Sequence, residues 1–403
     1  MLTLQVLCTA LVTLAAVVCL YHWILAVVGL WIRRRGAEAG QSSRHRFAIV
    51  VPAHNEEATL GATLDCLSSL DYPREKYHVY VIADNCTDGT ARVAEREGVT
   101  CLVRQDPQRR GKGYALEWAF PGVLSDGWDA LVVLDADCSV DADALRSFDR
   151  HLIAGHRVLQ ANDAVANVDE NSLTYVLGLA NFLENDLFYA PKSALGLAVF
   201  LRGTGMVFHR DVLAGHPWEA RSLAEDAEYT YRLLSRGIRV RFVREVRVLS
   251  DLPVRQDQLK IQRGRWIRGG VRLWDSAFRS IWEGLRRRRL ILIDAGLTSL
   301  MVNRSLVVGQ LLLTLAAAWC CAYWAAGPWS QTLLLSSLCI GGAYLAYGAL
   351  AVWLLAISPK KLSFLLTAPV LVGRYLWMAL RAAVGSGPSG WNRTPRVRLR
   401  HRQ

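Results

Sequence analysis

Residues 47–57 read FAIVVPAHNEE, a short apolar run that ends in a cluster of polar side chains. Two more runs of this kind cover residues 77–83 and 130–134. Apolar runs of this length, bounded by polar and turn residues, predict buried strands. Residues 47–52 are therefore predicted to form a strand, and His54, Asn55 and Glu56 follow its carboxyl end.

Helical patterns separate the predicted strands, at residues 58–70, 90–97 and 114–124. Strands that alternate with helices of this length predict an α/β fold, Rossmann-like, with a mostly parallel sheet and helices on both faces. In such folds ligands bind beyond the carboxyl ends of the strands. Polar side chains that follow the strands are therefore the first candidates for a site.

Carboxylates follow two of the predicted strands. Asp135 and Asp137 come after the strand at 130–134, and Asp84 closes the strand at 77–83. Two carboxylates separated by one residue can hold Mg²⁺ or Mn²⁺ while the cation grips a diphosphate. On its own such a pair is more often a solvated turn. For Asp84, base recognition is the functional alternative to a turn that caps the next helix.

Two later strings also allow a functional and a structural interpretation. Glu225 and Asp226 begin a helical stretch, where acidic residues complement the helix dipole, but a carboxylate in a pocket could take a proton from a hydroxyl. Residues 262–266 read QRGRW. Arg265 could neutralise a leaving diphosphate and Trp266 could stack on a sugar, or the string could belong to a basic interfacial helix.

Composition and charge favour a membrane protein. The chain has 403 residues, of which 52% are apolar, and 47 Lys plus Arg against 35 Asp plus Glu give a net charge of +12. Much of the basic excess flanks apolar stretches, so we expect contact with membrane lipids and not with nucleic acid. The nine Cys residues form no CxxC pair, and their spacing matches neither a zinc site nor a disulfide framework. Residues 109–113 lack the spacing of an ATPase phosphate loop.

Apolar runs divide the chain into membrane and soluble parts. The first is followed by Arg33, Arg34 and Arg35, which predicts a cytoplasmic domain after it. The run at 362–384 contains Arg374 and Arg381, so we expect an interfacial helix there. The predicted parts are a transmembrane helix at 1–32, a catalytic domain at 40–280, a membrane region at 285–384 with spans at 306–326 and 333–357, and a basic cytoplasmic tail at 385–403.

Taken in order, the motifs HNEE at 54–57, Asp84-Asn85, Asp135-Ala136-Asp137, Glu225-Asp226 and QRGRW resemble those of family-2 inverting glycosyltransferases with a GT-A fold. The QxxRW ending is similar to the membrane branch that contains cellulose, chitin, hyaluronan and poly-N-acetylglucosamine synthases. The resemblance covers about residues 46–275. Asn85 departs from it, because many synthases have a second Asp there.

The resemblance implies roles for individual residues. Asp226 would be the general base, with Glu225 beside it, and Asp137 would be the closer metal ligand, with Asp135. The nucleotide-sugar residues would be Pro52, Asn55, Glu56, Asp84, Lys112, Asp135, Gln262, Arg265 and Trp266. The acceptor residues would be Gly203, Thr204, Gly205 and Trp266.

The implied activity is inverting transfer from a UDP-sugar, at the inner face of the cell membrane, to a growing polysaccharide or oligosaccharide. The alternative is the addition of one sugar to a lipid-linked polyprenyl acceptor. QxxRW favours the polymer, whereas the small membrane part favours the lipid. A long product would need an export partner or a second copy. A non-catalytic protein would not need Asp135, Asp137 and Asp226 together.

Overall fold

Eight strands form one mixed sheet in the order β3-β2-β1-β4-β7-β6-β8-β5. The structure is a computed structural model that describes residues 2–33, 43–252, 254, 264, 268–270, 273–301, 304–355 and 359–383. The strands are β1 (Phe47–Ala53), β2 (Tyr77–Asp84), β3 (Val99–Arg104), β4 (Ala130–Val133), β5 (Cys138–Val140), β6 (Val158–Val165), β7 (Met206–His209) and β8 (Val240–Ser250).

Four strand pairs are parallel and three are antiparallel. The parallel pairs are β1–β2, β1–β4, β2–β3 and β6–β8, and the antiparallel pairs are β4–β7, β6–β7 and β5–β8. The predicted parallel sheet is therefore found around β1, and β7 inserts against the parallel direction between β4 and β6. The three predicted strands at 47–52, 77–83 and 130–134 correspond to β1, β2 and β4.

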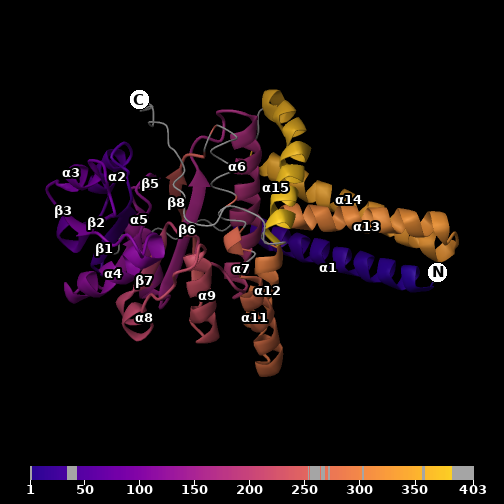
Figure 1. The fold of residues 1–403 in the computed structure, drawn as a ribbon, viewed down its shortest axis with the longest axis horizontal. Helices are drawn as coiled ribbons and strands as arrows, with labels where there is room; N and C mark the ends of the chain where they lie inside the picture. The colour runs from indigo at the N-terminus through magenta and orange to yellow at the C-terminus, as the bar shows by residue number, and fades with distance from the viewer. Residues whose placement is uncertain are drawn as a thin grey trace.

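Helices cover both faces of this sheet (Figure 1). Their bounds are α1 (Leu2–Arg33), α2 (Leu60–Ser68), α3 (Thr90–Ala94), α4 (Lys112–Ser125), α5 (Ala144–Ile153), α6 (Ser172–Glu184), α7 (Ala190–Ala194), α8 (Arg210–Gly215), α9 (Glu225–Ser235), α11 (Trp274–Arg287), α12 (Leu290–Met301), α13 (Arg304–Trp324), α14 (Pro328–Leu354) and α15 (Ala368–Ala383). The described elements also include two 3₁₀ helices, Arg74–Lys76 and Pro359–Thr367, and a π-helical segment, Asn185–Tyr189.

The core has two layers because successive strand residues point to opposite faces. In β1, Ala48 and Val50 pack with α4 and α9, whereas Ile49 and Val51 pack with α2 and α5. All four side chains are fully buried. Each Val or Ile buried in this way contributes roughly 1.5–3 kcal/mol, so the centre of the sheet is a rigid platform for the residues that follow its strands.

Three long apolar helices run side by side away from the sheet: α1, α13 and α14 (Figure 1). Cys8 and Val12 of α1 share an apolar cluster with Ala318 and Cys321 of α13. At 1.5 Å per residue the 21 residues of α13 span about 31 Å, the thickness of a hydrocarbon core. These helices occupy the three predicted spans at 1–32, 306–326 and 333–357, with boundaries displaced by a few residues.

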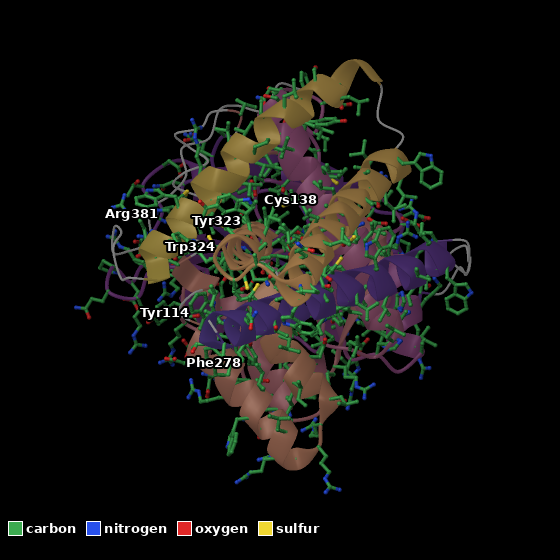
Figure 2. All side chains as sticks on the ribbon, turned by 90° about the vertical axis from the view of Figure 1, so that its right-hand side faces the viewer. Tyr114, Cys138, Phe278, Tyr323, Trp324 and Arg381 are labelled. Carbon is green, nitrogen blue, oxygen red and sulfur yellow. The ribbon has the colours of Figure 1, made fainter. Side chains whose placement is uncertain are left out.

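The fourth helix long and apolar enough to cross a membrane covers Lys361–Ala382. It includes α15, which lies across the inner end of the three-helix bundle and not along it (Figure 1). Exposed aromatic residues at the outer end of α13, Tyr323 and Trp324, face the viewer in Figure 2. Aromatic residues of this kind are enriched where a helix meets the membrane surface.

A buried ion pair joins the bundle to the sheet domain. Lys192 of α7 is fully buried, and its Nζ lies 2.8 Å from the carboxylate of Asp294 in α12. The hydroxyl of Tyr21 in α1 donates to the same carboxylate at 2.6 Å, and the Ala198 amide donates to it at 2.7 Å. The helix that carries Asp294, α12, therefore packs against the domain and α11.

Candidate active site

A cavity of about 640 Å³ opens at the carboxyl ends of β1 and β4. It continues past the loop before β7 to the first residues of α13, so it reaches from the sheet to the long apolar helices. Predicted site residues that line it are Pro52, Glu56, Asp84, Lys112, Asp135, Asp137, Gly203, Thr204, Glu225 and Asp226. Asn55 and Gly205 are predicted site residues that do not line it.

Lys112, the first residue of α4, connects the strand end of β4 to the loop before β7. Its Nζ pairs with the carboxylate of Asp135 and donates to the Gly203 carbonyl at 2.8 Å. Burial alone would lower the pKa of Lys112, but Asp135 and Glu225 outweigh burial and raise it. The ammonium is therefore charged at neutral pH, next to the residues predicted to hold a diphosphate.

Asp135, Asp137 and Cys138 form a group of metal-ligand atoms that lie within 4.8 Å of one another. Burial raises the pKa of the Cys138 thiol, so the sulfur is neutral and a poor partner for a hard cation. Carboxylate oxygens suit Mg²⁺ or Mn²⁺. Since Asp135 shares its charge with Lys112, Asp137 is the better ligand, and the donor set fits a divalent cation.

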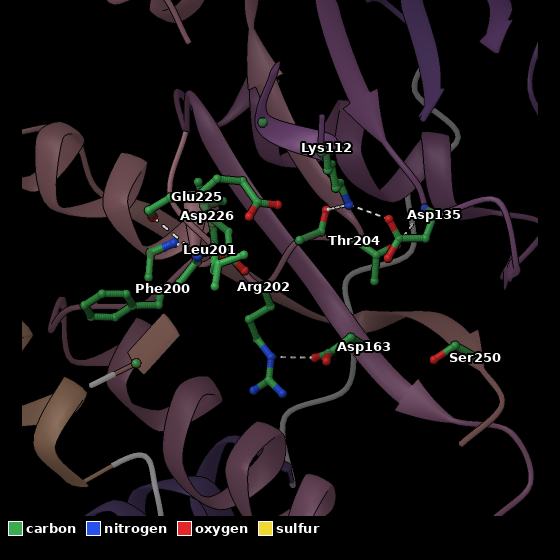
Figure 3. A pocket seen from close by; sticks show the side chains of 18 of the residues that line it. Lys112, Asp135, Asp163, Phe200, Leu201, Arg202, Thr204, Glu225, Asp226 and Ser250 are labelled. Carbon is green, nitrogen blue, oxygen red and sulfur yellow. Dashed lines mark hydrogen bonds and ion pairs between the residues drawn. The ribbon is translucent and has the colours of Figure 1, made fainter. Parts of the chain in front are cut away.

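Glu225 and Asp226 begin α9 and face the same part of the cavity (Figure 3). Burial, and after it the charge of Asp226, raise the pKa of Glu225 to about 7. Burial also raises the pKa of Asp226, against a lowering by the backbone amide of Ala227, which donates to it at 2.8 Å. A buried carboxylate with a raised pKa is a stronger base than a solvated one, as a proton acceptor requires.

The loop Gly203-Thr204-Gly205 lies between the base and the lysine. A Cβ added to Gly203 would be 3.7 Å from both Asp226 Oδ2 and Lys112 Nζ, so a side chain at this position would contact both groups. Thr204 Oγ1 accepts from the Asp135 amide at 3.1 Å. Gly205 instead faces the sheet, where a Cβ would be 2.8 Å from that of Ala161. Its role is to hold the loop against β6, with φ at +68°.

At the end of β1, Pro52 and Glu56 line the cavity but Asn55 turns away from it. Asn55 has a left-handed backbone with φ at +56°, a conformation that Asn tolerates better than most residues. Its side-chain oxygen accepts from the Thr87 amide at 2.7 Å. Asn55 therefore ties the loop after β1 to the loop after β2.

Asp84, at the end of β2, is almost completely buried. Its carboxylate accepts from Arg104 Nη1 at 2.5 Å and from the Asn85 amide at 2.9 Å. The Asn85 side-chain oxygen accepts from the Asp106 amide at 2.8 Å. An Asp at position 85 could not donate to Asp84, which gives a physical reason for the departure from the family pattern.

An ion-pair cluster around Arg202 was not among the predicted site residues. Arg202 Nε lies 2.9 Å from Asp163, its Nη1 lies 2.7 Å from Glu184, and its guanidinium stands over the ring of Tyr189 (Figure 3). Burial raises the pKa of Asp163 to about 6, although Arg202 opposes the increase. Arg202 directly precedes Gly203, and this adjacency is the sequence signal that could have indicated it.

Gln262, Arg265 and Trp266 lie outside the described residues. Gly264, between them, is described, and a Cβ on it would lie 3.6 Å from Cε of Met378 in α15. This part of the QRGRW string is therefore near the helix that crosses the end of the bundle.

The comparisons with known proteins agree with this geometry. The family model described as "Glycosyltransferase like family 2" matches residues 45–269, and the chain belongs to this family. It is therefore a glycosyltransferase with a GT-A-like fold, as the sequence predicted.

Individual relatives are more distant. A β-monoglucosyldiacylglycerol synthase of Nostoc sp. is 28% identical over 261 residues, 62% of this chain and 53% of the relative. The protein of that name in Synechocystis sp. is 30% identical over 240 residues, which are 56% of this chain and 48% of that relative. The chain thus spans about half the length of these curated relatives. The mannosyltransferase PcManGT of Pyrobaculum calidifontis, solved with GDP-Man and Mn²⁺, superposes with a TM-score of 0.60 at 20% identity, over 94% of this chain and 99% of that one.

Proposed function

We propose that the chain is an inverting, metal-dependent β-glycosyltransferase that transfers one sugar from a UDP-sugar to a lipid acceptor at the membrane surface. The observation that carries this proposal is the shape of the cavity. The carboxylates of Asp137 and Asp226 and the ammonium of Lys112 line one end, and Arg304 and Leu306 of α13 line the other. A lipid headgroup can enter such a cavity while its chains stay in the bilayer.

The chemistry is one displacement at the anomeric carbon of the donor. The acceptor hydroxyl attacks this carbon, Asp226 takes the hydroxyl proton, and the bond from the carbon to the diphosphate oxygen breaks. Attack from the side opposite the leaving group converts an α-linked donor into a β-linked product. Lys112 is positioned to balance the charge of the departing diphosphate.

Asp137, with Asp135, would hold the divalent cation. When bound, the cation supplies positive charge to the donor diphosphate as this becomes the leaving group. Pro52 and Asp84, at the strand ends, would contact the uridine, and Gly203 and Thr204 would contact the acceptor. Gln262, Arg265 and Trp266 keep the diphosphate and acceptor roles that the resemblance implies for them.

The lipid acceptor is supported by the relatives as well as by the cavity. Both glycolipid synthases are named for transfer to diacylglycerol. We place the domain in the cytoplasm and the chain in the inner membrane, because Arg33 to Arg35 follow α1 and the turn between α13 and α14 carries no charge.

A polymer-forming synthase is the second candidate, and QRGRW at 262–266 is the observation that favours it. The three-helix bundle argues against it in a single copy. Three spans are too few to enclose a polar channel, and polar groups that face lipid are costly. A second copy or an export partner would then have to complete the path.

A donor screen tests the proposal. The purified full chain in detergent is incubated with a panel of UDP- and GDP-sugars, Mn²⁺ or Mg²⁺, and a mixed lipid extract, and the released nucleotide and the lipid products are measured. We expect release of UDP that depends on the metal, with one sugar added to a lipid. Release of no nucleotide from any donor would refute the proposed activity.

A further inference from the structure

The cavity has a second end, beyond the Arg202 cluster, where it meets the membrane helices. The residues that line this end come from α12, α13 and α15 and are Thr298, Ser299, Arg304, Ser305, Leu306 and Tyr375. Neither the proton transfer nor the proposed metal site uses any of them. Arg304 is the only charged residue of this set, so it decides which headgroups can enter.

Two nitrogens of the Arg304 guanidinium, Nε and Nη1, are buried without a hydrogen-bond partner among the described residues. No carboxylate in the described ranges lies within ion-pair distance of Arg304. The guanidinium stands 5.9 Å from the ring centroid of Tyr347, whose hydroxyl also has no partner in the described part of the chain. A buried guanidinium without an anion is costly, which indicates that an anion approaches from the cavity.

The neighbouring acids do not supply this anion. Glu184 interacts electrostatically with Arg304, but its carboxylate pairs with Arg202 at 2.7 Å. Asp163 pairs with the same arginine at 2.9 Å. Both carboxylates therefore bond to Arg202, and neither lies within ion-pair distance of Arg304.

Resting on the proposed transfer, we infer that the acceptor is a phosphate-bearing lipid and that Arg304 binds its phosphate. A guanidinium matches phosphate oxygens in geometry and charge, and Arg304 begins a helix that is long and apolar enough to cross a membrane. In the proposed transfer the acceptor attacks through a hydroxyl whose proton goes to Asp226. The headgroup must therefore carry a hydroxyl beyond the phosphate, on the side toward Gly203. Diacylglycerol has the hydroxyl and lacks the phosphate.

Two lipid classes have this chemistry: a glycerophospholipid with a free hydroxyl, such as phosphatidylglycerol, and a sugar linked to a polyprenyl diphosphate. Transfer would balance in both cases. The hydroxyl oxygen bonds to the anomeric carbon, the proton goes to Asp226, and the nucleotide diphosphate leaves with the electron pair of the broken bond.

The test measures transfer by the full chain in neutral phosphatidylcholine nanodiscs, with the donor saturating. The acceptors are phosphatidylglycerol, polyprenyl-diphosphate-linked N-acetylglucosamine and diacylglycerol. We expect one phosphate lipid to be preferred, and the preferred one identifies the source. Arg304→Gln should raise the KM for that lipid roughly tenfold or more and leave the KM of the donor unchanged. Arg304→Lys should recover part of the loss.

Arg286→Gln, on the exposed last turn of α11, is the matched control for general attraction between basic residues and anionic lipid. It should keep the wild-type KM. A melting curve gives a readout without turnover, since the preferred lipid should raise the melting temperature of the wild type and not of Arg304→Gln. Equal use of diacylglycerol, or an unchanged KM and lipid-induced shift in Arg304→Gln, would overturn the inference. Absence of nucleotide release from the wild type would instead refute the proposed transfer.

Discussion

Two charged side chains lie close to one glycine. Asp226 and Lys112 reach Gly203 from two helices, and Lys112 holds Asp135 from a third segment. A side chain at position 203 would enter the space between base and ammonium, and φ there is +81°. At the residue scale, a single substitution at Gly203, Asp226 or Lys112 should therefore alter either the charge of the site or the space between its charged groups.

Asp137→Asn tests the metal site. The change removes one anionic oxygen from the predicted metal site, and hard cations such as Mg²⁺ and Mn²⁺ prefer oxygen ligands. We expect transfer to fall strongly and the Mn²⁺ or Mg²⁺ concentration for half-maximal activity to rise. Titration of metal into chelator-treated protein measures both quantities. Normal turnover in the chelated enzyme would show that Asp137 holds no catalytic metal.

Asp226→Asn tests the base. The amide cannot accept the hydroxyl proton, so we expect kcat to fall by about 10²- to 10⁴-fold while donor binding changes little. Steady-state kinetics together with UDP binding by calorimetry separate the two effects. If UDP affinity is lost and turnover of the bound donor is kept, Asp226 is a binding residue.

The pH profile follows from the raised pKa of the buried acids. Burial raises the pKa of Glu225 to about 7, so this group gains a proton as the pH falls through neutrality, and burial also raises the pKa of Asp226 above its ordinary value. Since the base must be ionised, kcat should decline by about tenfold for each pH unit below the apparent pKa of the acid limb. Glu225→Gln removes a neighbouring negative charge and should move this limb to lower pH. An acid limb at the ordinary value of a solvated carboxyl would contradict the burial of the pair.

At the scale of elements, the predictable part is what local patterns determine. The runs that became β1, β2 and β4 are short, apolar and bounded by polar residues, and the membrane helices are long and apolar. The antiparallel β7 was not predictable, because Met206–His209 is a four-residue strand whose direction depends on its partners. The Arg202–Glu184 pair joins two separate segments, so no local pattern indicates it.

The Lys192–Asp294 pair connects elements from three parts of the chain. Asp294→Asn leaves a buried ammonium without its counter-charge, which typically costs about 3–5 kcal/mol. Thermal unfolding in detergent should show a clearly lower melting temperature for this variant than for the wild type. The double variant Lys192→Met/Asp294→Leu removes both charges and should recover part of the decrease. A melting temperature equal to that of the wild type in Asp294→Asn would mean that the pair does not stabilise the domain on α1 and α12.

At the scale of the whole molecule, the sheet domain and the bundle meet at the cavity, and α12 and α15 cross this junction (Figure 1). The division at 40–280 and 285–384 and the orientation in the membrane stay predictions, the second from the placement of charge. The tail at 385–403 lies outside the described residues.

Cysteine labelling tests this orientation. Gln331→Cys lies in the first turn of α14, at the outer end of the bundle, and should react with an impermeant maleimide added to intact cells. Gln403→Cys should react only after the cells are opened, because the basic tail is expected in the cytoplasm. Labelling of position 403 from outside would mean that the helix over Lys361–Ala382 spans the membrane.

The number and linkage of sugars added to a limiting lipid acceptor test the central claim most directly. The purified chain is given excess labelled donor, and the product is examined by mass spectrometry and by NMR of its anomeric proton, with Asp226→Asn in parallel. We predict one sugar per lipid, β-linked from an α-linked donor, and almost no product from the variant. A ladder of sugars, an α-linked product, or wild-type yield from Asp226→Asn would contradict the account.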